Sequence, residues 1–158
     1  MAIRNPRKKF KFRVTFLTLP QLEPFAVQEI TLGDNEIEPV EHGFGNTVLK
    51  TAGMVKPGNV TLQRIMAAST SSVSGEFWEW ARLAQDPLTQ AGGDPATYKR
   101  VLQVDELAND GQTALDTWYI AGAWPATING REFSATDSAN TIESVELAVD
   151  FVSQNIPI

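Results

Sequence analysis

Residues able to catalyse a reaction or to bind a metal are few in this sequence, and their spacing matches no known site. His42 is the single histidine, and it follows Glu41 in a stretch without a serine-centred motif. A catalytic triad requires a nucleophile and an orienting acid around its histidine, so a surface role is the better interpretation of His42. With no cysteine in the chain, thiol nucleophiles and thiolate metal sites are excluded. The sequence therefore favours a protein that is not an enzyme.

Two other motifs resemble ligand sites but depart from them at essential positions. Asp34, Glu36 and Glu38 have the spacing of the first ligands of a calcium-binding loop, but Pro39 and Gly45 replace its essential glycine and glutamate. Gly92–Gly93 is followed by Asp94 and Pro95, without the lysine and helix start of a phosphate-binding loop. We therefore expect neither a metal nor a cofactor.

Composition and charge predict one globular domain over residues 1–158 that carries a basic N-terminal arm, 1–9. The chain is 42% hydrophobic and 20% charged, as in ordinary globular proteins. No apolar run approaches the roughly 20 residues that span a bilayer, so we expect no membrane anchor. Six of the thirteen cations lie before Val14, whereas all nineteen acids follow it. Such an arm can bind nucleic acid or the acidic surface of another copy, and the acidic body favours the second partner.

Alternation of apolar and polar residues predicts seven or more strands. The clearest lies near the C-terminus, from about Thr141 to Val152, where residues alternate between a predicted core face and a face toward solvent. The predicted core face is Val145, Leu147, Val149 and Phe151, and Ser144, Glu146, Ala148 and Asp150 form the other. Leu115 to Trp124 is a second strong strand, joined to a strand over Tyr98 to Leu107 by the turn residues 109–111. Further strands are expected over 10–16, 25–32, 36–42 and 59–66.

The remaining elements are one helix and one long loop. Apolar residues recur at three- and four-residue spacing from Val73 to Ala84, which predicts a short helix over about 74–85. Glycine and proline are frequent from Gly43 to Gly58, which predicts a long loop, and ordered loops of that length are usually functional. The fold is therefore expected to be mainly β, an antiparallel sandwich or barrel.

Two segments resemble the tube proteins of contractile bacteriophage tails. The first is Trp118, Ala123–Trp124–Pro125, Gly130 and the run Asn140 to Leu147, and the second is Gly53 to Arg64 with its Lys56–Pro57–Gly58 core. The order of the predicted elements also resembles that family, which is related to the tubes of type VI secretion and other contractile injection systems. Trp118, Trp124 and Pro125 are the residues that carry the family pattern, together with the predicted core of the last strand.

This resemblance implies a structural subunit of the virion tail, assembled in the host cytoplasm. Such subunits form hexameric rings that stack into a tube, whose lumen conducts genomic DNA without binding it specifically. A contracting sheath drives the tube through the host envelope. The implied partners are other copies of the chain, the tail sheath protein, the baseplate, the tail terminator and the tape measure protein.

The residues suggest how such a tube would be built. Carboxylates repel DNA phosphates, so a lumen wall is expected to use Glu146, Asp150, Asp34, Glu36 and Glu38, although the same acids could instead lie on the outer surface. Contacts between subunits or rings are expected at the basic arm and the long loop, through Arg4, Arg7, Lys8, Gly43, Gly45, Gly53, Lys56 and Pro57. The alternatives are the tube of a secretion or injection system, a monomeric β-barrel that binds a ligand, and a barrel that binds nucleic acid through its basic arm.

Overall fold

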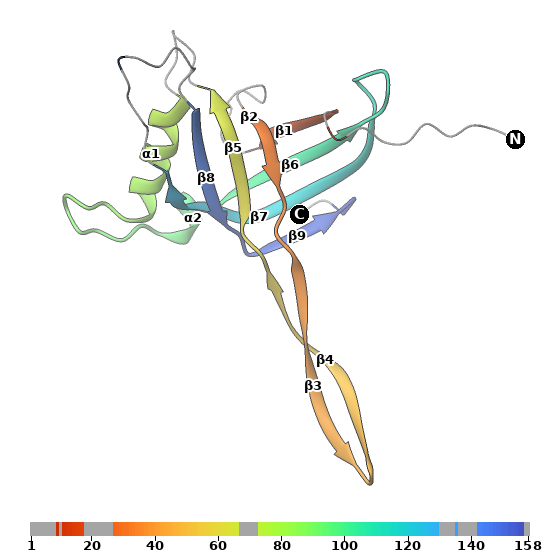
Figure 1. The fold of residues 1–158 in the computed structure, drawn as a ribbon. Coiled ribbons are helices and arrows are strands. Elements are labelled where there is room, and N and C mark those ends of the chain that lie inside the picture. The colour runs from red at the N-terminus through yellow and green to blue at the C-terminus, as the bar shows by residue number, and fades with distance from the viewer. Residues whose placement is uncertain are drawn as a thin grey trace, which may run out of the picture.

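The computed structural model describes residues 9, 11–17, 27–66, 73–129, 135 and 142–156. These residues form nine strands and two helices (Figure 1). In chain order the elements are β1 Phe12–Phe16, β2 Val27–Thr31, β3 Asn35–Phe44, β4 Thr47–Pro57, β5 Val60–Met66, α1 Val73–Ala84, α2 Pro95–Tyr98, β6 Arg100–Leu107, β7 Ala114–Ile128, β8 Ile142–Ala148 and β9 Phe151–Gln154.

The body of the molecule has two antiparallel layers that share strand β7. The first part of β7 pairs with β6 and β9, and its last part, from Trp124, pairs with β8. One layer, sheet A, therefore contains β1, β6, β9 and the start of β7. The other, sheet B, contains β2, β5, β8 and the end of β7, and Figure 1 shows the two layers running in different directions. This arrangement confirms the mainly β, sandwich-like fold. Among the described residues β1 and β2 lie at opposite ends of the strand order, so the sheet does not close into a barrel.

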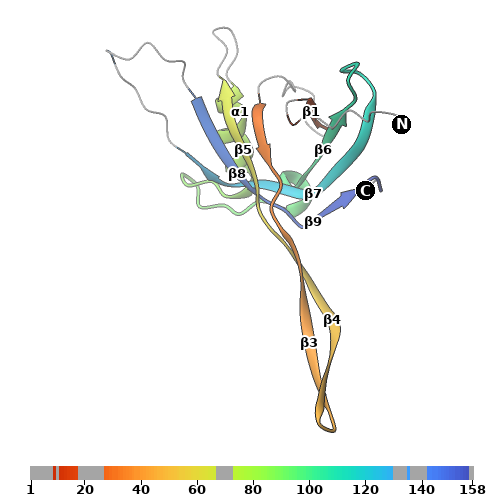
Figure 2. The same cartoon turned by 45° about the vertical axis from the view of Figure 1, so that its right-hand side comes forward.

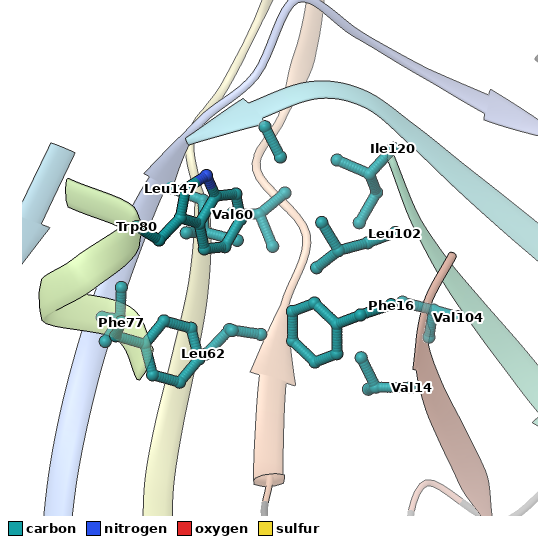
Figure 3. Close-up of a cluster of buried hydrophobic side chains, with 12 residues drawn as sticks. Val14, Phe16, Val60, Leu62, Phe77, Trp80, Leu102, Val104, Ile120 and Leu147 are labelled. Carbon is teal, nitrogen blue, oxygen red and sulfur yellow. The ribbon is translucent and has the colours of Figure 1, made fainter. Parts of the chain in front are cut away.

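The core lies between the two layers and is closed on one side by α1. Alternate residues of sheet A and sheet B point inward, and Figure 3 shows them facing one another. Phe77 and Trp80 of α1 complete the cluster, with Phe77 in edge contact with Phe16 at a centroid distance of 6.3 Å. The buried strand residues include Val14, Phe16, Leu102, Val104 and Ile120 from sheet A, and Val60, Leu62, Val145 and Leu147 from sheet B.

The predicted helix is confirmed, and a second, shorter helix follows it. Helix α1 buries Phe77 and Trp80 because these residues stand three positions apart and so share one face. The indole Nε1 of Trp80 donates a hydrogen bond to the carbonyl oxygen of Tyr98, at 2.5 Å, which ties α1 to the end of α2. Asp94 caps α2 by accepting from the amide of Ala96. In the part of the chain that the structure describes, neither helix is long and apolar enough to cross a membrane.

The predicted hairpin between β6 and β7 is also confirmed. The strands pair antiparallel, and Gly111 has a φ of +73° in the connecting turn. The carboxylate of Asp110 accepts hydrogen bonds from the hydroxyl of Thr113 and from the amides of Thr113 and Gln112. These hydrogen bonds lower the pKa of Asp110 to about 2, and the bond from the Thr113 hydroxyl has the largest effect.

Two predictions about secondary structure were wrong. The segment 43–58 is not a loop, because β3 continues to Phe44 and Thr47–Pro57 is a strand in its own right. The last strand is not continuous either, because β8 ends at Ala148 and β9 begins at Phe151. Val145 and Leu147 are buried as predicted and Val149 packs against the core, but the break leaves Phe151 47% exposed. Phe151 is therefore not a core residue.

Candidate assembly interface

Strands β3 and β4 form a two-stranded hairpin that leaves the body of the molecule. They pair only with each other, as a separate two-stranded sheet, and Figures 1 and 2 show the hairpin reaching far from both layers. Every residue of β3 is exposed, and so is most of β4. An isolated two-stranded hairpin is at best marginally stable in water. This hairpin therefore has the features of an arm that is completed by another molecule.

Local sequence explains why the arm forms a hairpin. Gly45 and Asn46 are the two residues between the paired ends Phe44 and Thr47. Gly45 has a φ of +60°, which only glycine adopts without cost, and a glycine at the first central position is typical of a type II′ turn. The hydroxyl of Thr47 donates to the carbonyl oxygen of Phe44 across the turn, at 2.9 Å.

Apolar side chains cover much of the exposed arm. Half of the large hydrophobic residues exposed in the described chain belong to this hairpin, and an exposed apolar surface of this kind marks an interaction site. Their charged neighbours are paired within the arm, as Lys56 with Glu38 at 2.9 Å and Lys50 with Glu41 at 3.6 Å. The hydrophobic residues are Ile37, Val40, Phe44, Val48, Leu49, Met54 and Val55.

Glycines hold the strands of the arm close together at its root and at a bulge. A Cβ on Gly33 would lie 2.5 Å from the carbonyl carbon of Gly58, and the amide of Gly58 donates to the carbonyl oxygen of Asp34 at 2.7 Å. Further along, the register shifts between Ile37 and Pro39, where a Cβ on Gly53 would lie 2.5 Å from the carbonyl oxygen of Glu38. The chain therefore leaves and re-enters the body through one narrow, closely packed neck.

The predicted contact residues fall in different places. Gly43, Gly45, Gly53, Lys56 and Pro57 are all in the arm, the first two at its tip and the last two at its root. Arg4, Arg7 and Lys8 lie outside the described residues, as does Gly130 of the family pattern.

The five acids predicted for a channel wall lie on three parts of the molecule. Asp34, Glu36 and Glu38 are at the root of the arm, where Glu36 stands opposite Lys56 in the strand register. Glu146 is on β8, and Asp150 lies between β8 and β9. Asp150 forms an ion pair with Lys99 at 2.9 Å, so its charge is matched locally.

Glu146 belongs to a polar row on the face of sheet B opposite the core. The cross-strand register places Thr31, Thr61, Glu146 and Thr127 side by side on four neighbouring strands. The side-chain amide of Asn59 donates to Glu146 at 2.6 Å. This row offers hydroxyl groups and one carboxylate, a surface suited to contact with water and unsuited to binding a polyanion.

A different polar cluster lies on the face of sheet A opposite the core. Asp105 is only 1% exposed, and its carboxylate accepts from Gln103 Nε2, Thr117 Oγ1 and the Arg13 guanidinium at 2.9 to 3.3 Å. Burial raises the pKa of Asp105, but these hydrogen bonds outweigh burial and hold its pKa below the ordinary value. The cluster joins β1, β6 and β7, and was not anticipated from the sequence. The alternation of Arg13 and Asp105 with buried neighbours was its available signal.

The residues of the family pattern are structural. Trp118 packs against the core, Pro125 is buried opposite Leu147, and Trp124 makes an edge contact with Tyr98 at a centroid distance of 6.0 Å. The apolar residues of the arm were missed as functional residues because glycines led the segment to be interpreted as a loop. The available signal was Gly45–Asn46 between two extended runs, which is a hairpin pattern.

The fold is shared with a class of solved structures, those of contractile injection systems. A tube-terminating cap of the anti-feeding prophage has the same fold, with a TM-score of 0.76 and 19% identity over 99% of this chain and 95% of that one. A chain in the sheath–tube complex of the extracellular contractile injection system PVC, in its extended state, has a TM-score of 0.74 and 18% identity. The match covers 97% of this chain and 93% of that one.

Sequence similarity identifies the family within this class. Residues 8–153 match the family described as T4-like virus tail tube protein gp19, and the chain belongs to that family. The tail tube protein gp19 of Enterobacteria phage T4 is 27% identical over 143 residues, which are 89% of this chain and 86% of that protein. The protein is therefore a structural subunit of a phage tail tube, located in the virion tail, and not an enzyme.

Proposed function

We propose that the chain, as a single tail tube domain, assembles into hexameric rings that stack into a hollow tube. The observation that carries this proposal is the β3–β4 arm, which exposes apolar side chains on both of its strands in a protein of the tail tube family. Burial of these side chains against another copy would supply the free energy that the isolated hairpin lacks. Stacking also requires a contact between unlike surfaces, because such a contact repeats without limit.

In this proposal the arm contacts an adjacent subunit or ring. Two observations support an arm that docks as a preformed unit. Four of its charged side chains form two ion pairs within it, and its strands are already hydrogen bonded to each other, so docking orders little additional backbone. The basic segment with Arg4, Arg7 and Lys8 is proposed to contact an acidic surface of a neighbour, because residues 14–158 carry seven cations and nineteen acids.

The outer face of sheet B is proposed to line the channel, with Glu146 at its centre. The Thr31–Thr61–Glu146–Thr127 row lets DNA pass because a repeated ring of carboxylates repels phosphates. Asp34, Glu36 and Glu38 at the root of the arm and Asp150 at the corner are also proposed to face the channel. The ion pairs of Glu38 with Lys56 and of Asp150 with Lys99 reduce what these two acids add to the negative field. A Glu146→Lys tube should retain short DNA at low salt and release it as salt rises. Equal retention by the unchanged tube would contradict this assignment.

The proposed partners are those of a contractile tail. The PVC structure contains a tube with its sheath, and other structural relatives come from a sheath and tube terminator complex and from a baseplate. We extend these partners to this chain as the tail sheath, the tail terminator and the baseplate. The tape measure protein and genomic DNA are proposed to occupy the channel during assembly and ejection.

Negative-stain microscopy of the purified chain tests this function directly. Rings or hollow rods with sixfold symmetry are the expected result, and their fraction should increase with protein concentration. Small, featureless particles at every concentration would instead support a monomeric β-domain. Salt-sensitive binding of DNA by such particles would support the nucleic-acid alternative.

A further inference from the structure

The two layers of the body meet at one corner, where strand β7 changes sheets. Residues 118–121 of β7 pair with β9, whereas residues from Trp124 onward pair with β8. Between these two stretches stands Gly122, with a φ of +66°. A left-handed φ of this kind is rarely adopted by residues other than glycine, so the bend is built into the sequence at this position.

The chain between β8 and β9 turns beside the bend at Gly122. β8 ends at Ala148 and β9 begins at Phe151, and Asp150 lies between them. The amide of Asp150 donates to the carbonyl oxygen of Ala121 at 2.9 Å. Its carboxylate covers Gly122 so closely that a Cβ there would lie 2.1 Å from Asp150 Oδ2. The two connections between the layers therefore contact each other at one point.

Lys99 completes the corner from the side of the helices. Its Nζ donates to both carboxylate oxygens of Asp150, each at 2.9 Å, and these hydrogen bonds are the main reason that the pKa of Lys99 is raised. The amide of Lys99 donates to the carbonyl oxygen of Pro95, which holds it against α2, and the preceding residue, Tyr98, accepts from Trp80 of α1. Both helices are thus joined to the bend.

We propose that Asp150 is a positioning residue, and that the Gly122–Asp150–Lys99 corner fixes the angle between sheets A and B. The pair is half exposed, with side-chain exposures of 33% for Lys99 and 48% for Asp150, and ion pairs so exposed contribute little to stability. The ion pair instead acts on geometry. Gly122 has no side chain to restrain its backbone, so the bend must be held by neighbouring residues. The inference rests on the proposed function in one respect, since the fixed angle would set how subunits meet in a ring.

Spin labels report the angle directly, and the chain contains no native cysteine that would interfere. Leu115 on sheet A and Thr31 on sheet B are both exposed, so a protein with Leu115→Cys and Thr31→Cys carries one label on each layer. The distance distribution between the labels is measured with Asp150 present and in Asp150→Ala and Lys99→Met variants. Arg82→Met is the matched control, because it removes the ion pairs of Arg82 with Glu79, at 3.0 Å, and with Asp86, at 3.5 Å, and leaves the corner intact.

The expected result is a distribution at least twice as wide in both corner variants, with a melting temperature within about 3 °C of the unchanged protein. Lys99→Arg should keep the narrow distribution, and Arg82→Met should resemble the unchanged protein. Ring yield at a fixed protein concentration should fall about tenfold in the corner variants. An unchanged width in Asp150→Ala would overturn the proposal, and so would a large loss of melting temperature without any widening. If the corner variants widen the distribution but the unchanged protein never forms rings, the corner proposal is supported and the tube proposal is refuted.

Discussion

Replacing one leucine of the arm is expected to weaken assembly in addition to its effect on the subunit. Leu49 is 54% exposed on β4, so its side chain is only partly covered in the free subunit. Removing three carbons from a fully buried leucine costs about 2.4 kcal/mol, at about 0.8 kcal/mol for each CH₂. Only about half of that burial remains to be gained when the arm docks. Leu49→Ala should therefore cost about 1.3 kcal/mol per docked arm, which is roughly a tenfold change in the equilibrium constant for each contact.

The chain offers a matched control for this substitution. Leu88 is 83% exposed and lies outside the arm, after helix α1, so Leu88→Ala removes the same atoms from a surface with no proposed role. The assay is sedimentation velocity over a range of protein concentrations, with the melting temperature of the dilute subunit measured in parallel. Leu49→Ala should shift the concentration at which rings and rods appear upward by about tenfold or more, and Leu88→Ala should not shift it. Equal shifts in the two variants, or no shift in Leu49→Ala, would refute the role of the arm.

Three further substitutions test the subunit itself. Phe77 is only 1% exposed in the core, so Phe77→Ala should lower the free energy of unfolding by about 3 to 5 kcal/mol and the melting temperature by roughly 10 °C. Thermal unfolding measures both, and a loss below about 1 kcal/mol would contradict the assigned packing. Gly33→Ala places a Cβ 2.5 Å from Gly58 and should destabilise the neck of the arm by about 1 to 3 kcal/mol, visible as faster hydrogen exchange in β3 and β4, whereas Gly43→Ala, whose Cβ would meet nothing within 4 Å, serves as its control. Asp105 has a lowered pKa in the folded state, so its contribution to stability is present above the pKa of the unfolded chain, near 4, and is lost as the pH falls through the lower folded value. Unfolding titrations between about pH 6 and 2 should therefore show a weaker acid dependence in Asp105→Asn than in the unchanged protein, and identical curves would contradict this contribution.

Elements with a strong local pattern could be predicted from the sequence. Val145 and Leu147 alternate with polar residues and are buried in β8, and the turn at Asp110 joins β6 to β7 as expected. The helix over 73–84 also followed its apolar spacing. In each case neighbouring residues along the chain contain the whole signal, because strand alternation and helical spacing depend on local geometry.

Features that depend on distant segments were not predicted. Phe151 continues the alternation of β8 but is exposed, because the chain turns at Asp150 to reach the other layer. The glycines of the arm were interpreted as loop residues, yet Gly53 allows the strands to approach closely and Gly45 forms the turn. A glycine in a sequence indicates only freedom of the backbone, and what uses that freedom is decided by the segment packed against it.

The sequence by itself determined the mainly β fold, the single main helix and the resemblance to tail tube proteins. Tertiary structure alone decided that residues 35–57 form a projecting arm, that Asp105 is buried, and that Asp150 meets Lys99 and Gly122 at the corner. The physical reason is the same in each case. Periodicity states which residues share a face, but burial and ion pairing depend on which segments, many positions apart in the chain, are brought to lie against that face.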